Sequence, residues 1–98
     1  MNNEQKIAID QEQSQTCLDS AEREQIRAER KQQTRERIGR RIKALRTEMK
    51  LTQGELAERA GLQLTHISRI EAGKYSVGID TLSAIANVLG KQLDFVEQ

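Results

Sequence analysis

The side chains that could do chemistry in this sequence are mainly basic, and most lie in its middle. Residues 21–50 hold eleven Lys and Arg against five acids, a net charge of +6, whereas residues 1–20 carry −3 and residues 51–98 carry −2. The total of +1 therefore hides a stretch that suits phosphate oxygens. The candidates for phosphate contact are Arg35, Arg37, Arg40, Arg41 and Lys43. A solvated helix face with ordinary surface charge is the alternative interpretation.

Nothing in the sequence indicates a catalytic or metal centre. The single cysteine, Cys17, cannot form an internal disulfide and excludes a cysteine-based zinc site. The single histidine, His66, has no companion ligand. No Ser/His/Asp grouping and no glycine-rich phosphate loop is visible in the sequence. We therefore expect no enzyme activity, no cofactor and no metal.

The sequence also lacks the marks of a membrane or secreted protein. No apolar run approaches the length of about 18 residues that a membrane span needs. The first residues, MNNEQK, do not form a basic region followed by an apolar stretch. We expect a cytoplasmic protein that does not contact a membrane.

The spacing of apolar residues predicts an all-α fold. Ile38, Ile42, Leu45 and Met49 recur at intervals of four, three and four, which places them on one face of a helix. Similar patterns predict helices over about residues 35–49, 52–60, 63–72 and 79–89. The tail, residues 91–98, alternates in polarity, which fits either a short strand or a fifth helix.

Residues 1–34 differ from the rest because they are rich in Gln, Glu and Arg and have no apolar stripe to bury. A capping box of Asp19 and Glu22 predicts that a helix starts near Ser20. We expect residues 1–34 to be a polar, charged extension, mostly mobile up to residue 18 and partly helical beyond it. Residues 35–98 then form the folded domain.

The second and third predicted helices form a helix-turn-helix pattern. Thr52 and Glu55 make a Thr-x-x-Glu capping box at the start of the second helix, and Gly61 ends it. The small side chains of Ala57 and Ala60 let the third helix cross closely. The outer face of the third helix is then free to enter the DNA major groove, whose width admits one helix. Gly73 is expected to cap the third helix at its end.

Three landmarks keep a known order and spacing: LTQ-x-ELA at residues 51–57, G-x5-ISRIE-x-G at 61–73, and TL-x-x-IA-x-x-LG at 81–90. With these landmarks, residues 38–95 resemble the lambda-repressor-like domain of the Xre/Cro type. The resemblance implies a four- to five-helix bundle that contains a helix-turn-helix, with the tail as a short C-terminal strand in one version. It also implies a DNA-binding regulator, or one of the related antitoxins.

The resemblance assigns roles to particular residues. Gln53 would touch a DNA phosphate at the start of the second helix, where a helix N-terminus attracts anions. Arg69 would read a guanine with its guanidinium fork. Arg46 and Glu71 match a structural pair that bridges the first and third helices in relatives. The positions that would face or approach DNA are Gln63, Leu64, Thr65, His66, Ser68, Arg69 and Lys74.

Two of these positions depart from the family pattern. Leu64 stands where relatives usually carry Gln, so it either contacts a thymine methyl group or lies at the edge of the core. Gln63 stands where a Ser or Thr cap is usual, so we expect the start of the third helix to be weakly capped.

The tail bears on the oligomeric state. A core of about 60 residues is marginal alone, and association of subunits is a common remedy. Leu93 and Phe95 could pair across a two-fold axis as an intermolecular sheet, or they could cover the core of their own chain. A homodimer is the expected state on double-stranded DNA.

The sequence thus predicts a sequence-specific transcriptional regulator, a repressor that inserts the helix at residues 63–72 into the major groove as a homodimer. The first alternative is an antitoxin that binds its own operator and neutralises a protein toxin through residues 1–34. The second is an interaction module that has kept the fold and lost DNA binding.

Overall fold

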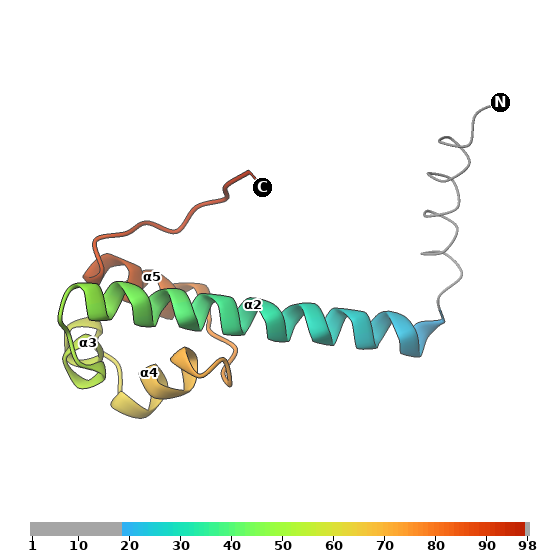
Figure 1. Ribbon diagram of the computed structural model, residues 1–98, viewed down its shortest axis with the longest axis horizontal. Helices are drawn as coiled ribbons and strands as arrows, with labels where there is room; N and C mark the ends of the chain where they lie inside the picture. The colour runs from blue at the N-terminus through green and yellow to red at the C-terminus, as the bar shows by residue number, and fades with distance from the viewer. Residues whose placement is uncertain (1–18, 98) are drawn as a thin grey trace. The chain divides into compact units, whose positions relative to one another are not determined.

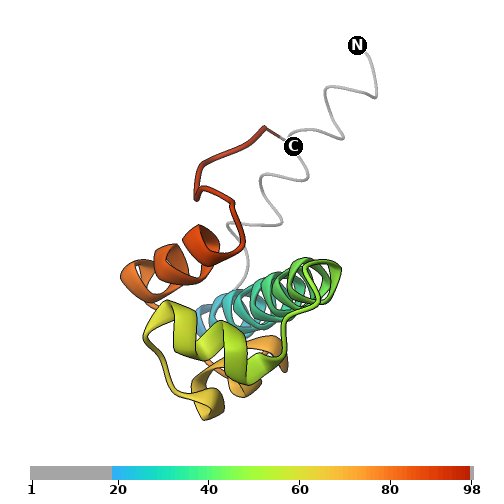
Figure 2. The same ribbon diagram turned by 90° about the vertical axis from the view of Figure 1, so that its left-hand side faces the viewer.

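The computed structural model describes residues 19–97, and they form an all-α fold. The elements are α2 (Ser20–Glu48), α3 (Gln53–Ala60), α4 (Leu64–Glu71) and α5 (Ile79–Val88). Figure 1 shows them in chain order, and Figure 2 shows the same molecule turned by 90°. The expected mobility of residues 1–18 lies outside the described residues. None of the described helices is long and apolar enough to cross a membrane.

The chain divides into two units between residues 31 and 32. In the first unit, α2 begins at Ser20 as predicted, and the preceding Asp19 caps it. The Glu22 backbone N–H donates to Asp19 Oδ1 at 2.7 Å, and the Asp19 N–H donates to Glu22 Oε1 at 3.4 Å. The side chains of residues 19–31 are exposed except for Ile26, which is half-buried. This part of α2 therefore shows no apolar face of its own.

The second unit, residues 32–98, contains the core. Its buried side chains come from every helix: Ile42 of α2, Leu56 and Ala57 of α3, Ile67 and Ile70 of α4, and Ile85 of α5, with Leu89 after it. Leu56 and Ile67 are completely buried. The 3.6-residue apolar pattern of each helix therefore meets in one centre, as the sequence predicts.

The helix ends follow the predicted signals closely. Thr52 caps α3, where its Oγ1 accepts from the Glu55 N–H at 3.0 Å and its own N–H donates to Glu55 Oε1 at 2.8 Å. Gly61 ends α3 with φ of +72°, a left-handed conformation that glycine adopts without strain. Gln63 caps α4 without a side-chain hydrogen bond, so the predicted weak cap is confirmed.

Two expectations about the apolar pattern are wrong. Met49 is 44% exposed, because α2 ends at Glu48 and the chain turns there; Leu51 is buried instead. Residues 91–97 form neither a strand nor a fifth helix. Phe95 is fully exposed and does not cover the core of its own chain, whereas Leu93 is 38% exposed and lines the same groove as Leu82 and Leu89.

Candidate nucleic-acid interface

Helix α4 has one buried side and one exposed side. Ile67 and Ile70 point into the core, and both are at most 2% exposed. Their neighbours along the helix lie on the opposite side: Leu64, Thr65, Ser68 and Arg69 are all exposed. The structure therefore brings four of the predicted DNA-facing residues onto one surface. Leu64 is 53% exposed, so a large part of its side chain is available for an apolar contact from outside.

A buried ion pair ties the end of α4 to α2. Arg46 Nε donates to Glu71 Oε2 at 2.7 Å, and Arg46 Nη2 donates to Glu71 Oε1 at 3.0 Å. Arg46 Nη1 also donates to the Leu51 carbonyl at 2.7 Å. The hydrogen bond to Glu71 raises the pKa of Arg46, so the guanidinium stays charged. The structure thus places this predicted structural pair side by side.

Gln53 extends the same network to the start of α3. Its Nε2 donates to Glu71 Oε1 at 3.0 Å, and its side chain is half-buried. One amide hydrogen of Gln53 is therefore used inside the protein. The second hydrogen and the first backbone N–H groups of α3 remain for a phosphate. Of the buried side-chain polar atoms in the described chain, none lacks a hydrogen-bond partner.

Helix α2 approaches the backbone of α4 through a glycine that sequence reasoning did not single out. A Cβ atom on Gly39 would lie 2.5 Å from the Ile70 carbonyl oxygen and 2.7 Å from that of Glu71. Nearby, Gln32 Nε2 donates to the Gly73 carbonyl at 3.0 Å, and Gly73 itself has φ of +73°. These backbone contacts fix where α4 ends relative to α2.

An aromatic residue that sequence reasoning missed lies beside two predicted DNA-facing residues. The Tyr75 and His66 rings stack, with centroids 5.6 Å apart and planes 14° apart. The guanidinium carbon of Arg69 lies 5.7 Å from the centroid of the Tyr75 ring. The only signal in the sequence is that Tyr75 is the sole tyrosine and follows the Gly73 turn by two residues.

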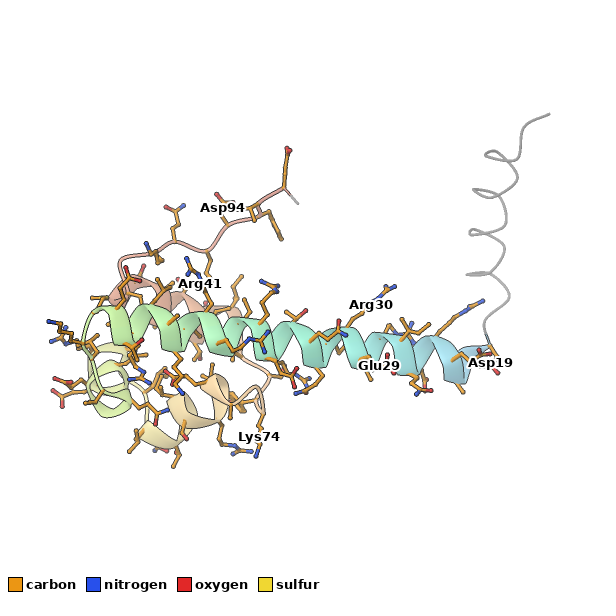
Figure 3. All side chains as sticks on the ribbon, in the orientation of Figure 1. Asp19, Glu29, Arg30, Arg41, Lys74 and Asp94 are labelled. Carbon is orange, nitrogen blue, oxygen red and sulfur yellow. The ribbon has the colours of Figure 1, made fainter. Side chains whose placement is uncertain are left out.

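The remaining basic candidates are not brought together. Lys74 is exposed just after α4. Arg40 is exposed on α2, and Arg41 lines a groove between α2 and α5. In Figure 3, Arg41 lies on the side of α2 toward the C-terminal segment, while Lys74 lies on the other side, beyond α4. Arg41 is therefore placed away from the exposed side of α4.

The chain matches known proteins over this same region. The sequence pattern of the helix-turn-helix family matches residues 42–96. The chain belongs to the helix-turn-helix family. It is 44% identical over 59 residues to the immunity repressor protein of Bacillus phage phi105, covering 60% of this chain and 41% of that relative. The chain thus spans about two fifths of the length of this curated relative.

A solved structure is also similar. The crystal structure of the clp gene regulator ClgR from Corynebacterium glutamicum shares 28% sequence identity, with a TM-score of 0.58. The match covers 59% of this chain and 62% of that chain. These findings confirm the resemblance to lambda-repressor-like helix-turn-helix domains and the all-α fold. The family is a class of DNA-binding regulator domains and not of enzymes.

Within the helix-turn-helix frame, α3 and α4 are the two helices of the motif and Gly61 is the turn between them. The part of the chain that the structure describes holds no group of three or more His, Cys, Asp or Glu side chains able to bind a metal ion. The exposed side chains of α4 offer hydrogen bonds from Thr65 and Ser68, an apolar surface on Leu64 and a positive charge on Arg69.

Proposed function

We propose that this protein is a sequence-specific DNA-binding transcriptional regulator, a repressor that inserts α4 into the major groove of its operator. The observation that carries the proposal is the two-sided character of α4. Its inner side is anchored by Ile67 and Ile70, and its outer side presents Leu64, Thr65, Ser68 and Arg69. A helix fixed from beneath and polar above suits the major groove, about 12 Å wide. The relatives support this role, because one is named an immunity repressor and the other a gene regulator.

The outer side chains offer distinct contacts to bases. The Arg69 fork donates two hydrogen bonds to guanine O6 and N7, and Leu64 provides an apolar contact for a thymine methyl group. Thr65 and Ser68 supply hydroxyl groups to bases or phosphates. Gln53 and the N-terminus of α3 supply a phosphate contact that sets the register of the helix in the groove.

The test begins with duplexes selected from random DNA by the wild-type protein. On the selected sequence, Arg69→Ala should weaken binding by about 1–3 kcal/mol and relax the preference at one base pair. Arg69→Lys is the matched control, because it keeps the charge and removes the fork. It should lose the base preference and keep the binding to unrelated DNA. A wild-type protein without sequence preference at low salt would refute the proposal.

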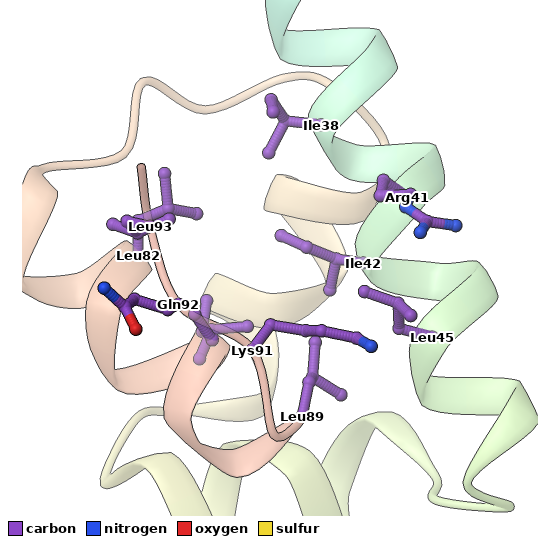
Figure 4. A pocket seen from close by; sticks show the side chains of 11 residues that line it. Ile38, Arg41, Ile42, Leu45, Leu82, Leu89, Lys91, Gln92 and Leu93 are labelled. Carbon is purple, nitrogen blue, oxygen red and sulfur yellow. The ribbon is translucent and has the colours of Figure 1, made fainter. Parts of the chain in front are cut away.

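We propose further that the protein acts as a homodimer through the groove between α2 and α5. The groove has a volume of about 120 Å³, and its walls are apolar. Figure 4 shows the side chains that line it, among them Ile38, Ile42, Leu45, Leu82, Leu89 and Leu93. Arg41 and Lys91 also line the groove, and the charged side chains at the groove are therefore positive.

The second copy supplies an occupant of matching chemistry. Phe95 is 102% exposed and Val96 is 83% exposed, so both apolar side chains are in water in the single chain. They are flanked by Asp94 and Glu97, whose charges complement Arg41 and Lys91. Exchange of these segments between two copies would bury the aromatic ring of each in the groove of the other. We expect the two α4 helices of the dimer to address half-sites about 34 Å apart, the spacing of one turn of DNA that dimers with this motif use.

Sedimentation equilibrium tests this dimer. Phe95→Ser should give a folded monomer whose melting temperature no longer depends on protein concentration, whereas Ile79→Ser should remain a dimer. Ile79 is the matched control because it is an apolar residue of similar exposure, 75%, at the start of α5. Arg41→Glu should weaken the dimer, and Asp94→Arg in the same chain should restore it. A dimer that survives Phe95→Ser contradicts the proposed surface, and a monomeric wild type contradicts the dimer itself.

A further inference from the structure

The Tyr75 ring occupies a position between the core and the exposed side of α4. Its side chain is half-buried and packs against the hydrophobic core. The same ring stacks on His66 and lies under the guanidinium of Arg69. His66 and Arg69 are three residues apart, which places them on one face of the helix. One ring therefore contacts Arg69, which belongs to the surface proposed to meet DNA, and the half-buried His66 beside it.

The backbone holds Tyr75 in this place. Helix α4 ends at Glu71, and Gly73 turns the chain with φ of +73°. The Lys74 N–H then donates to the Arg69 carbonyl at 2.9 Å, which folds the chain back along the helix. Tyr75 follows directly, so the turn delivers its ring to the face that carries Arg69. The ring is fixed by backbone and core, whereas Arg69 has a long and flexible side chain.

We propose that Tyr75 is a positioning residue that prepares Arg69 for base recognition, an inference that rests on the proposed DNA-binding function. A guanidinium over an aromatic face is attracted by the ring quadrupole. The ring offers no conventional hydrogen-bond acceptor to the guanidinium above it, so the N–H donors of Arg69 remain for a guanine. Within residues 19–97, no hydrogen bond or ion pair engages the Arg69 guanidinium, and Tyr75 is its one specific contact. Restricting the side chain before binding reduces the conformational entropy lost on DNA.

The test compares two substitutions of the ring in the full chain. Tyr75→Phe keeps the ring and removes the hydroxyl group, whereas Tyr75→Leu keeps apolar bulk and removes the ring. Each is measured on the duplex selected by the wild type and on the same duplex with 7-deazaguanine at the guanine that Arg69 reads. The ratio of the two dissociation constants reports the Arg69 contact and not general affinity.

The expected loss follows from the strength of an exposed cation–π contact. Tyr75→Leu should reduce the discrimination ratio about two- to fivefold, and Tyr75→Phe should preserve it. In an Arg69→Ala background the ratio should be close to one, and Tyr75→Leu should cause no further loss of affinity for the selected duplex. Binding to unrelated DNA should be the same for all Tyr75 variants.

Each other outcome overturns the inference in a distinct way. Equal losses for Tyr75→Phe and Tyr75→Leu would mean that the hydroxyl group contacts DNA directly. A loss that persists in the Arg69→Ala background would mean that Tyr75 acts through the fold. If the wild type prefers its selected duplex and Tyr75→Leu changes nothing, the inference fails and the proposed function stands. If the wild type has no preference, the proposed function itself fails.

Discussion

Replacing Glu71 by glutamine should cost this protein a large part of its stability. The Glu71 side chain is 3% exposed and accepts three hydrogen bonds, two from Arg46 and one from Gln53. In Glu71→Gln only one oxygen remains as an acceptor, and the N–H₂ group takes the place of the other. This group and an N–H donor of Arg46 or Gln53 then face each other, and neither can accept a hydrogen bond. The Arg46 guanidinium, whose side chain is 10% exposed, keeps its charge and loses its counter-ion.

The size of the loss can be worked out from this arrangement. Removing one partner of a buried ion pair typically costs about 3–5 kcal/mol, because the remaining charge stays desolvated. A domain of this size has about 5–15 kcal/mol in all, so this loss is a large share of the total and should lower the urea concentration at the unfolding midpoint. Replacing both partners, Arg46→Met with Glu71→Leu, should recover part of the loss, since apolar pairs of similar volume are often neutral. The recovery should be incomplete, because the Leu51 carbonyl and the Gln53 amide lose their partners.

Urea denaturation followed by circular dichroism measures these differences in the free energy of unfolding. Glu58→Gln is the matched control, because Glu58 is exposed on α3 and makes none of these contacts. Its effect should stay within about 0.5 kcal/mol. A loss for Glu71→Gln of under about 1 kcal/mol would show that water reaches the Arg46 charge and that the desolvation argument is wrong.

Two further predictions concern backbone packing and pH. Gly39→Ala should destabilise the protein by about 1–3 kcal/mol, because its Cβ would meet the carbonyl oxygens of α4. Gly54→Ala should instead stabilise the protein by about 0.5–1 kcal/mol, because a Cβ atom at this position has only Thr52 Oγ1 near it, at 3.9 Å. If urea titrations gave both variants a change of the same sign in the free energy of unfolding, this reasoning would be contradicted. The hydrogen bond from the Thr52 N–H lowers the pKa of Glu55 below its ordinary value of 4.5. The ionised Glu55 carboxylate therefore stabilises the folded protein fully above pH 4.5, and this stabilisation is lost as the pH falls through the lower pKa of the folded state. The melting temperature of the wild type should therefore fall more than that of Glu55→Gln between about pH 5 and about pH 2, and parallel curves would exclude this role for the carboxylate.

Local signals in the sequence predicted most of the fold. The capping box of Thr52 and Glu55 correctly predicts where α3 starts, and Gln63 correctly predicts that α4 lacks a side-chain cap. Both predictions succeed because a helix cap depends only on residues within one turn. The apolar period locates every core helix. It fails at Met49, where the period continues past the true end of α2 and the next inward position is taken by Leu51.

The candidate site depends more on contacts that are distant in sequence. The exposed face of α4 follows from helical spacing, whereas Tyr75 reaches that face only because the chain reverses at Gly73. Gly39 looks like any glycine inside a charged helix until α4 is seen against it. The phosphate contact of Arg41 was predicted from the density of basic residues along the sequence. That density does not tell on which side of the domain the Arg41 side chain lies. The toxin partner, the cytoplasmic location and the domain boundary at residues 34 and 35 stay predictions.

Helix α4, the proposed recognition helix, obtains almost all of its order from its neighbours. Helix α4 has eight residues and no side-chain cap, while an isolated helix is marginal in water below about 12–15 residues. Its shape therefore depends on Ile67 and Ile70 in the core, on the close approach of Gly39, and on the Arg46–Glu71 pair. Changes at these buried positions should weaken DNA binding without touching DNA, because they lower the population of chains in which α4 is formed. Such variants should lose affinity for specific and unrelated DNA alike, whereas Arg69→Lys and Tyr75→Leu should weaken the preference for the selected sequence and keep the binding to unrelated DNA. That difference separates the residues that build the recognition helix from the residues that read with it.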